Sequence, residues 1–225
     1  RTSRRPLPQG KVSRNQALIW GLFLGFLGIG LLLVYVNLLT AVLTFLSLIG
    51  YAVFYTMYLK RATPQNIVIG GAAGAAPPIL GWTSIAGVQG IEYALLLFLI
   101  VFIWTPPHFW ALAIHRHEEY KKAEVPMLPV THGLQFTRVQ ILLYTVLLFI
   151  VTLLPYLTGM SGIIYLVSAV MLGVLFLGYT VKIYREPENP KIAFKTFKYS
   201  VNYLMVLFVS LLVDHYLLIT FRTIS

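Results

Sequence analysis

Long apolar runs separated by short polar stretches make up most of the chain. A helix that crosses a membrane needs about 20 mostly apolar residues, because the hydrocarbon layer is roughly 30 Å thick. Runs of this kind occur at Ala17–Val36, Leu38–Met57, Ile91–Ile114, Gln140–Leu157, Ile163–Ile183 and Ser200–Thr220. The pattern therefore predicts an all-α, polytopic membrane protein.

One further segment, Asn66–Trp82, is less clear. It is rich in Gly and Ala, and it carries the pair Pro77–Pro78. Small residues let helix backbones approach closely in membranes, whereas consecutive prolines break or kink a helix. Taken alone, the segment fits a re-entrant element as well as a full span.

The composition agrees with a membrane protein and excludes several alternatives. Hydrophobic residues make up 58% of the chain and charged residues only 11%, and the mean hydropathy is +0.80. The absence of cysteine excludes disulfides, thiolate metal sites and cysteine nucleophiles. The basic residues behind the net charge of +10 lie in loops between apolar runs. Their position indicates a role in membrane orientation rather than binding of nucleic acid.

The placement of these charges decides the number of spans. If Asn66–Trp82 crosses the membrane, 16 of the 17 Lys and Arg residues fall on one side, and only Arg222 falls on the other. If the segment does not cross, this asymmetry disappears. The positive-inside rule therefore predicts seven spans, with a cytoplasmic N-terminus and the C-terminus outside.

Two cytoplasmic segments could bind an anion. Arg1 and Arg5 are four residues apart, so on a helix both guanidinium groups could face one anion, although arginines before a span also serve as orientation signals. Lys60 and Arg61 precede Pro64 and Asn66, where a helix N-terminus would offer free backbone N–H groups. This second signal is weak by itself.

A third segment carries the remaining candidate chemistry. His108 lies near the cytoplasmic end of an apolar run, where it is either a hydrogen-bonded interfacial residue or a group facing a cavity, as a general base or haem ligand. Glu118 and Glu119 form an adjacent pair close to Lys121. Such a pair either forms a solvated ion-pair cluster or holds Mg²⁺ together with substrate phosphates.

Three motifs in the first 133 residues resemble one known family. They are Arg-Thr-x-x-Arg-Pro-Leu at Arg1–Leu7, the Lys-Arg-Ala-Thr-Pro-Gln-Asn run of Lys60–Asn66 with its glycines up to Pro77–Pro78, and Pro107-His-Phe-Trp110 followed by Glu119-Tyr-Lys121 and Val125-Pro-Met-Leu-Pro-Val130. Together these motifs are similar to those of the protohaem IX farnesyltransferases (haem O synthases), which are UbiA-type prenyltransferases. The last three spans match only in pattern.

The resemblance implies a single domain over residues 1–225, of the nine-helix UbiA type with about seven helices present. It implies transfer of the farnesyl group of farnesyl diphosphate to a vinyl group of haem B, which gives haem O. Mg²⁺ would be held by Glu119 and Glu118. Diphosphate would be bound by Arg1, Arg5, Lys60 and Asn66, and catalysis would involve His108, Glu119 and Lys121.

The chain departs from the family at its start, because an Asn-x-x-x-Asp-x-x-x-Asp stretch normally precedes the Arg-Thr motif. We therefore expect an N-terminally truncated chain that is inactive alone. The family also implies a bacterial cell membrane, surrounding lipid, and haem A synthase or a terminal oxidase assembly as partners. The alternatives are a UbiA-type enzyme acting on a quinone precursor or a chlorophyll-type alcohol, and a transporter with broken helices.

Overall fold

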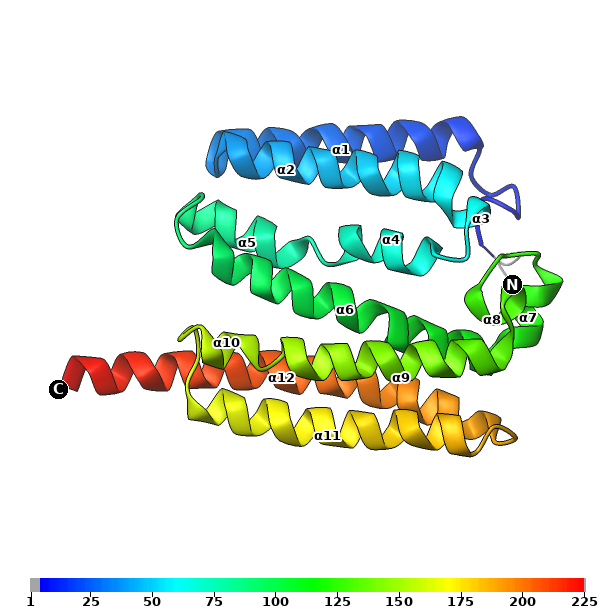
Figure 1. Ribbon diagram of the computed structural model, residues 1–225. Helices are drawn as coiled ribbons and strands as arrows, with labels where there is room; N and C mark the ends of the chain where they lie inside the picture. Colours follow the sequence, from blue (N-terminus) through cyan, green and yellow to red (C-terminus); the bar gives the residue numbers. More distant parts are fainter. Residues whose placement is uncertain (1–4, 225) are drawn as a thin grey trace.

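The computed structural model describes residues 5–224, and every regular element in that range is helical. The long helices run side by side, as Figure 1 shows. In chain order the elements are α1 (Arg14–Tyr35), α2 (Leu38–Ile49), the π-helix η1 (Gly50–Leu59), α3 (Lys60–Ala62), α4 (Asn66–Gly74), α5 (Pro77–Ala86), α6 (Ile91–His115), α7 (His117–Lys122), α8 (Leu128–Thr131), α9 (Gly133–Val151), α10 (Leu154–Leu157), α11 (Ile163–Arg185) and α12 (Pro190–Ile224).

The helices pack in an order that follows the chain. Helix α2 packs on α5, and η1 packs on α4. Helices α4 and α5 lie against α6, which also contacts α9 and α12, and α11 covers both of these. The largest buried cluster lies among α6, α9, α11 and α12 and includes Ile100, Leu148, Tyr165, Phe176 and Tyr203. The C-terminal helices therefore form the best-packed part of the bundle.

Helices long and apolar enough to cross a membrane number six in the described residues. They are Arg14–Tyr35, Leu38–Leu59, Ile91–His115, Gly133–Leu157, Ile163–Arg185 and Lys191–Leu217. The prediction of a multi-pass helical membrane protein is confirmed.

The expected span Asn66–Trp82 is not one continuous helix. It is divided into α4 and α5, with Ala75 and Ala76 between them. Pro77 and Pro78 cause the division, because proline has no N–H to donate and disfavours helical backbone in the residue before it. Figure 1 shows α4 and α5 one after the other along the length of α6, so the pair makes one passage. With the six long apolar helices, this pair gives residues 5–224 seven passages along the bundle, and the seven membrane spans stay a prediction.

The ends of two other helices lie well outside the predicted apolar runs. Helix α9 begins at Gly133 rather than at Gln140, and α12 begins at Pro190 rather than at Ser200. Thr137 and Arg138 near the start of α9 are polar but buried, and the Arg138 Nη2 donates to the Pro187 carbonyl oxygen at 2.7 Å. A search for apolar runs does not detect helical turns that bury polar side chains against another loop.

The basic loops share one end of the bundle. Figure 1 places α3, α7 and α8 at the end where α1 and α9 begin and where α11 passes into α12. Asp214 lies towards the opposite end and is almost fully buried. Its carboxylate accepts hydrogen bonds from the backbone N–H groups of Gly162, Ile164 (3.1 Å) and Tyr165 (3.3 Å). Asp214 of α12 thus caps the N-terminus of α11.

Candidate functional site

The predicted site residues lie at the basic end of the bundle in two groups. Lys60 and Asn66 lie where α3 passes into α4, whereas Glu118, Glu119 and Lys121 belong to α7. Both groups are at the same end in Figure 1, but no hydrogen bond or ion pair joins them within residues 5–224. Arg5 is exposed in a turn before α1. Arg1 lies outside the described residues.

Asn66 is the most enclosed of these residues, with 1% of its surface exposed. Its amide Nδ2 donates to the Lys60 carbonyl oxygen at 3.1 Å and so holds α3 against the start of α4. Its Oδ1 has no hydrogen-bond partner. A buried acceptor without a partner costs about 1–3 kcal/mol, so this oxygen is suited to accept from a ligand or water.

The two carboxylates of α7 remain available for a cation. Glu118 accepts from His117 Nδ1 at 3.2 Å, and Glu119 lies 3.9 Å from Arg116. Their side chains are 73% and 57% exposed. The described residues contain no group of three or more His, Asp or Glu side chains arranged around one point. The pair fits Mg²⁺, which takes one or two carboxylates with phosphate oxygens, better than a cage made by protein alone.

His108 lies deeper than the α7 carboxylates. It is seven residues before His115, the last residue of α6, which is about 10 Å along the helix axis. Its ring is 7% exposed and stacks on Trp104 at 4.1 Å between centroids. Its Nδ1 contacts Ser200 Oγ at 2.7 Å. The structure therefore does not bring His108 and Glu119 together, and the two would act on different parts of a substrate.

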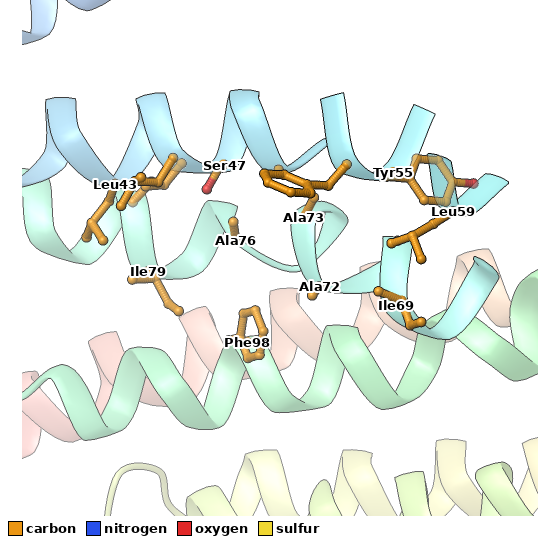
Figure 2. A pocket seen from close by; sticks show the side chains of 15 residues that line it. Leu43, Ser47, Tyr55, Leu59, Ile69, Ala72, Ala73, Ala76, Ile79 and Phe98 are labelled. Atoms are coloured by element: carbon orange, nitrogen blue, oxygen red, sulfur yellow. The ribbon is translucent and has the colours of Figure 1, made fainter. Parts of the chain in front are cut away.

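An apolar groove of about 480 Å³ lies between η1 and α4, and we call it the η1–α4 groove. Figure 2 shows Leu43 at one end and Tyr55 and Leu59 at the other. One wall is formed by α2 and η1 and the other by α4 and α5, and Phe98 of α6 also lines the groove. The lining residues are Leu43, Leu46, Ser47, Gly50, Phe54, Tyr55, Leu59, Ile69, Gly70, Ala72, Ala73, Ala76, Ile79, Leu80 and Phe98.

A second apolar groove of about 470 Å³ lies across the α4–α5 break, and we call it the α5–α12 groove. It includes Trp104, the residue on which His108 stacks. The other lining residues are Gly74, Pro77, Pro78, Val101, Val201, Leu204, Met205 and Phe208. The bundle thus has two apolar grooves, one on each side of the broken helix.

The η1–α4 groove ends at Leu59, directly before Lys60. An apolar groove that ends next to a basic segment suits a ligand that has a long apolar chain and an anionic headgroup. Isoprenoid diphosphates have this form, and prenyltransferases are one class of membrane enzyme that acts on them. The fold and the groove are consistent with this class.

The comparison with known families agrees with this class. The model of the UbiA prenyltransferase family matches residues 1–202. The chain belongs to the UbiA prenyltransferase family and is a prenyltransferase. The transporter alternative is therefore wrong.

Two similar curated proteins carry the same name. The chain is 74% identical over 219 residues to the protoheme IX farnesyltransferase of Ruthia magnifica subsp. Calyptogena magnifica, with 97% of this chain and 73% of that protein covered. It is 70% identical over 220 residues to the protein of the same name from Vesicomyosocius okutanii subsp. Calyptogena okutanii, with 98% and 74% covered. The resemblance of the sequence motifs to this family is confirmed.

A solved structure shares the fold. A digeranylgeranylglyceryl phosphate synthase superimposes with a TM-score of 0.76 at 26% identity, covering 94% of this chain and 73% of that one. The prediction of an all-helical bundle of the UbiA type is confirmed.

Sequence reasoning did not find several residues that surround His108. Ser200 lies 92 positions later in the chain, and Phe197 packs on the imidazole at 4.6 Å. Neither stands in a motif, because the contact depends on how α12 lies against α6. The only sequence signal was indirect, since a histidine in an apolar run requires a polar partner.

Proposed function

We propose that this prenyltransferase transfers the farnesyl group of farnesyl diphosphate to a vinyl group of haem B and produces haem O and diphosphate. The names of the relatives at 70–74% identity support this choice of substrates. The observation that carries the proposal is the η1–α4 groove, whose apolar length ends beside Lys60.

The farnesyl chain would lie in the η1–α4 groove, where burial of each CH₂ group contributes about 0.8 kcal/mol. The diphosphate would lie at the basic end of the bundle, near Lys60 and near Asn66, whose buried Oδ1 has no hydrogen-bond partner. Because that Oδ1 is an acceptor, it would hold a water or metal-bound water next to the headgroup rather than a phosphate oxygen. Arg1, Arg5 and Lys121 would add positive charge around the leaving group.

Glu118 and Glu119 would hold Mg²⁺ through their exposed oxygens. The cation would neutralise charge on the diphosphate and make it a better leaving group. Lys60 and Lys121 would stabilise the same charge as it develops, which is commonly the largest contribution to catalysis.

The bond changes define what the site must accomplish. The bond between the allylic carbon and the diphosphate oxygen breaks, and diphosphate leaves with the electron pair. The vinyl π electrons of haem B form the new C–C bond to the allylic carbon. The cation left beside the porphyrin ring takes the oxygen of water, which loses a proton, so the product carries a hydroxyl group.

His108 would serve the acceptor side of this reaction. Its ring neighbours Trp104, which lines the α5–α12 groove. From that position His108 would orient haem, by ligation or through a propionate, or accept the proton from water.

The setting of the enzyme follows from the charge division and from the bacterial relatives. We place the chain, as one domain over residues 1–225, in the bacterial cell membrane with the basic end in the cytoplasm. The farnesyl diphosphate headgroup would arrive there from water. Haem A synthase or a terminal oxidase assembly would receive the product.

The test is haem O formation in membranes that contain the protein expressed from its complete open reading frame. Haem B, farnesyl diphosphate and Mg²⁺ are added, and the haems are separated by chromatography and identified by mass. We expect haem O, and we expect chelation of Mg²⁺ to prevent its formation. Prenylation of an added quinone precursor without any haem O would overturn the proposal.

The variants His108→Ala and Glu119→Gln test the assigned residues. Both should abolish haem O formation and leave membrane insertion unchanged. A variant that forms wild-type amounts of haem O removes its residue from the site.

A further inference from the structure

The side-chain hydroxyl of Ser200 makes two short contacts at a buried position. It lies 2.7 Å from His108 Nδ1 and 2.7 Å from the Phe197 carbonyl oxygen. Ser200 is fully buried and His108 is 7% exposed. The contact joins α6 to α12 between residues 92 positions apart.

Both contacts of Ser200 Oγ can be hydrogen bonds in only one arrangement of the hydrogens, and we take that arrangement as the basis of the inference. A serine hydroxyl has one hydrogen, and a carbonyl oxygen can only accept. Ser200 Oγ therefore donates to the Phe197 carbonyl oxygen and accepts at His108. In the neutral ring the proton then lies on Nδ1, and Nε2 carries the lone pair.

Aromatic side chains also fix the orientation of the His108 imidazole ring. Trp104 stacks on one side of the imidazole at 4.1 Å and 20° between planes, and Phe197 packs at 4.6 Å and 31°. The edge of the ring contacts Phe109 at 4.9 Å. Trp104 Nε1 also donates to the Ser200 carbonyl oxygen at 2.8 Å, which ties the aromatic wall to the same serine.

The other imidazole nitrogen is left for a ligand. Across residues 5–224, Nε2 of His108 has no hydrogen-bond partner and the ring has no carboxylate partner. In many enzymes a carboxylate or carbonyl group orients the ring of a functional histidine. Here a serine hydroxyl occupies that position.

We propose that Ser200 is a positioning residue that holds His108 as the Nδ1–H tautomer, so that Nε2 offers its lone pair to the acceptor substrate. The catalytic consequence rests on the proposed function, whereas the tautomer itself does not. Without the hydroxyl, Nδ1 loses its acceptor, and the ring is free to carry its proton on Nε2. That nitrogen could then neither accept a proton nor bind iron.

The tautomer is measured directly with ¹⁵N-histidine-labelled protein in detergent micelles. The imidazole ¹⁵N signals of His108 are assigned from their loss in His108→Gln. We expect the Nδ1–H form in the wild type and in Ser200→Thr, and the Nε2–H form or a mixture in Ser200→Ala. A wild-type signal of the Nε2–H form, or an unchanged signal in Ser200→Ala, overturns the proposal.

Ser210→Ala is the matched control. Ser210 lies on the same helix and is buried, and its Oγ donates to the Leu207 carbonyl oxygen three residues earlier at 2.8 Å. It thus repeats the local bond of Ser200 without the contact to histidine. Ser210→Ala should leave the His108 signals unchanged, and a change equal to that of Ser200→Ala would show a general effect of α12 and overturn the proposal.

Haem prenylation tests the consequence for catalysis. General acid–base groups contribute typically 10²- to 10⁴-fold, so loss of the correct tautomer should lower kcat by roughly 10-fold or more in Ser200→Ala. The KM for farnesyl diphosphate should not change, and Ser200→Thr should restore kcat. A changed tautomer with unchanged kcat overturns the positioning role. If the wild type forms no haem O, the proposed function fails, and the ¹⁵N signals still decide the tautomer.

Discussion

Gly70 shows how one missing side chain shapes the η1–α4 groove. A Cβ atom placed on Gly70 would lie 2.3 Å from Cε2 of Tyr55, a distance that no folded protein tolerates. The ring of Tyr55 lies in the groove wall near its basic end (Figure 2). The glycine therefore permits η1 to approach α4 closely at this point.

We predict that Gly70→Ala forces the Tyr55 ring to move and narrows the groove. A groove narrowed enough to exclude one CH₂ group loses about 0.8 kcal/mol of burial, so the KM for farnesyl diphosphate should rise by roughly 4-fold. Gly81→Ala on α5 is the control, because a Cβ there meets nothing within 4 Å. Equal KM values for the two variants would show that the groove does not hold the prenyl chain.

Asp214 is a second residue whose role was not evident in the sequence. Its position in an apolar span is compatible with a paired charge, but the structure gives it three backbone N–H donors at the start of α11. The partners belong to a different helix some 50 residues earlier. No sequence pattern links the two, so this contact could not be predicted.

We predict that Asp214→Ala destabilises the bundle by about 2 kcal/mol, because loss of a helix cap costs roughly 0.5–2 kcal/mol and the donors are partly buried. Asp214→Asn should lose less stability than Asp214→Ala, since the asparagine side chain keeps one acceptor oxygen. Melting temperatures measured in detergent should rank the wild type as the most stable, then Asp214→Asn, then Asp214→Ala. An alanine variant as stable as the wild type would contradict the capping role.

Helices α9 and α11 approach each other closely where α11 carries Gly173. A Cβ on Gly173 would lie 2.2 Å from Cδ2 of Phe149. On the same helix, a Cβ on Gly178 would meet nothing within 4 Å. Small residues at helix interfaces are typical of membrane bundles, because van der Waals packing drives association there.

These two glycines give a paired prediction. Gly173→Ala should lower the free energy of unfolding by about 1–3 kcal/mol, since the new Cβ would meet Cδ2, Cε2 and Cγ of Phe149 and the whole ring would have to shift. Gly178→Ala should have no such effect. Unfolding of both variants in a detergent titration provides the comparison, and a similar loss in both would place the strain elsewhere in α11.

Most of the helices could be predicted from the apolar pattern, because crossing a membrane requires long apolar runs. The break within Asn66–Trp82 could be suspected from Pro77–Pro78. That both halves pack against α6 could not be predicted from the sequence. Helix α6 shows the limit of the proline rule, since it continues through Pro106 and Pro107 to His115. Packing against α4, α5, α9 and α12 supports that helix despite the missing N–H groups.

Within the candidate site, the sequence indicated His108, Asn66 and the α7 carboxylates as polar residues near the basic loops. It could not indicate that Ser200 contacts His108. Motifs report residues close in sequence. The surroundings of His108 come from α12, whose position is set by the fold of the whole chain.

Across the whole molecule, the seven passages place the basic loops at one end and the loop between α5 and α6 at the other (Figure 1). The sequence contains no cysteine, so labelling of a single introduced cysteine shows on which side of the membrane that residue lies, with no labelling of other residues of the sequence. Val88 lies in the α5–α6 loop and is 67% exposed, and Glu188 lies exposed in the loop before α12.

We predict that a membrane-impermeant maleimide labels Val88→Cys in intact cells and does not label Glu188→Cys. Once the cells are made permeable, both variants should react. The positive-inside rule gives the physical reason, because Lys and Arg side chains are retained in the cytoplasm. Labelling of Glu188→Cys in intact cells would reverse the proposed orientation.

The broken helix has a consequence for how two ligands would influence one another. Ala73 of α4 lines the η1–α4 groove, whereas Gly74 and Pro77 line the α5–α12 groove. One pair of short helices thus separates the two grooves, and a sideways displacement that widens one narrows the other. Affinities in the two grooves are then thermodynamically linked, and the linkage is reciprocal. Order of substrate addition and product release would follow from the position of α4 and α5.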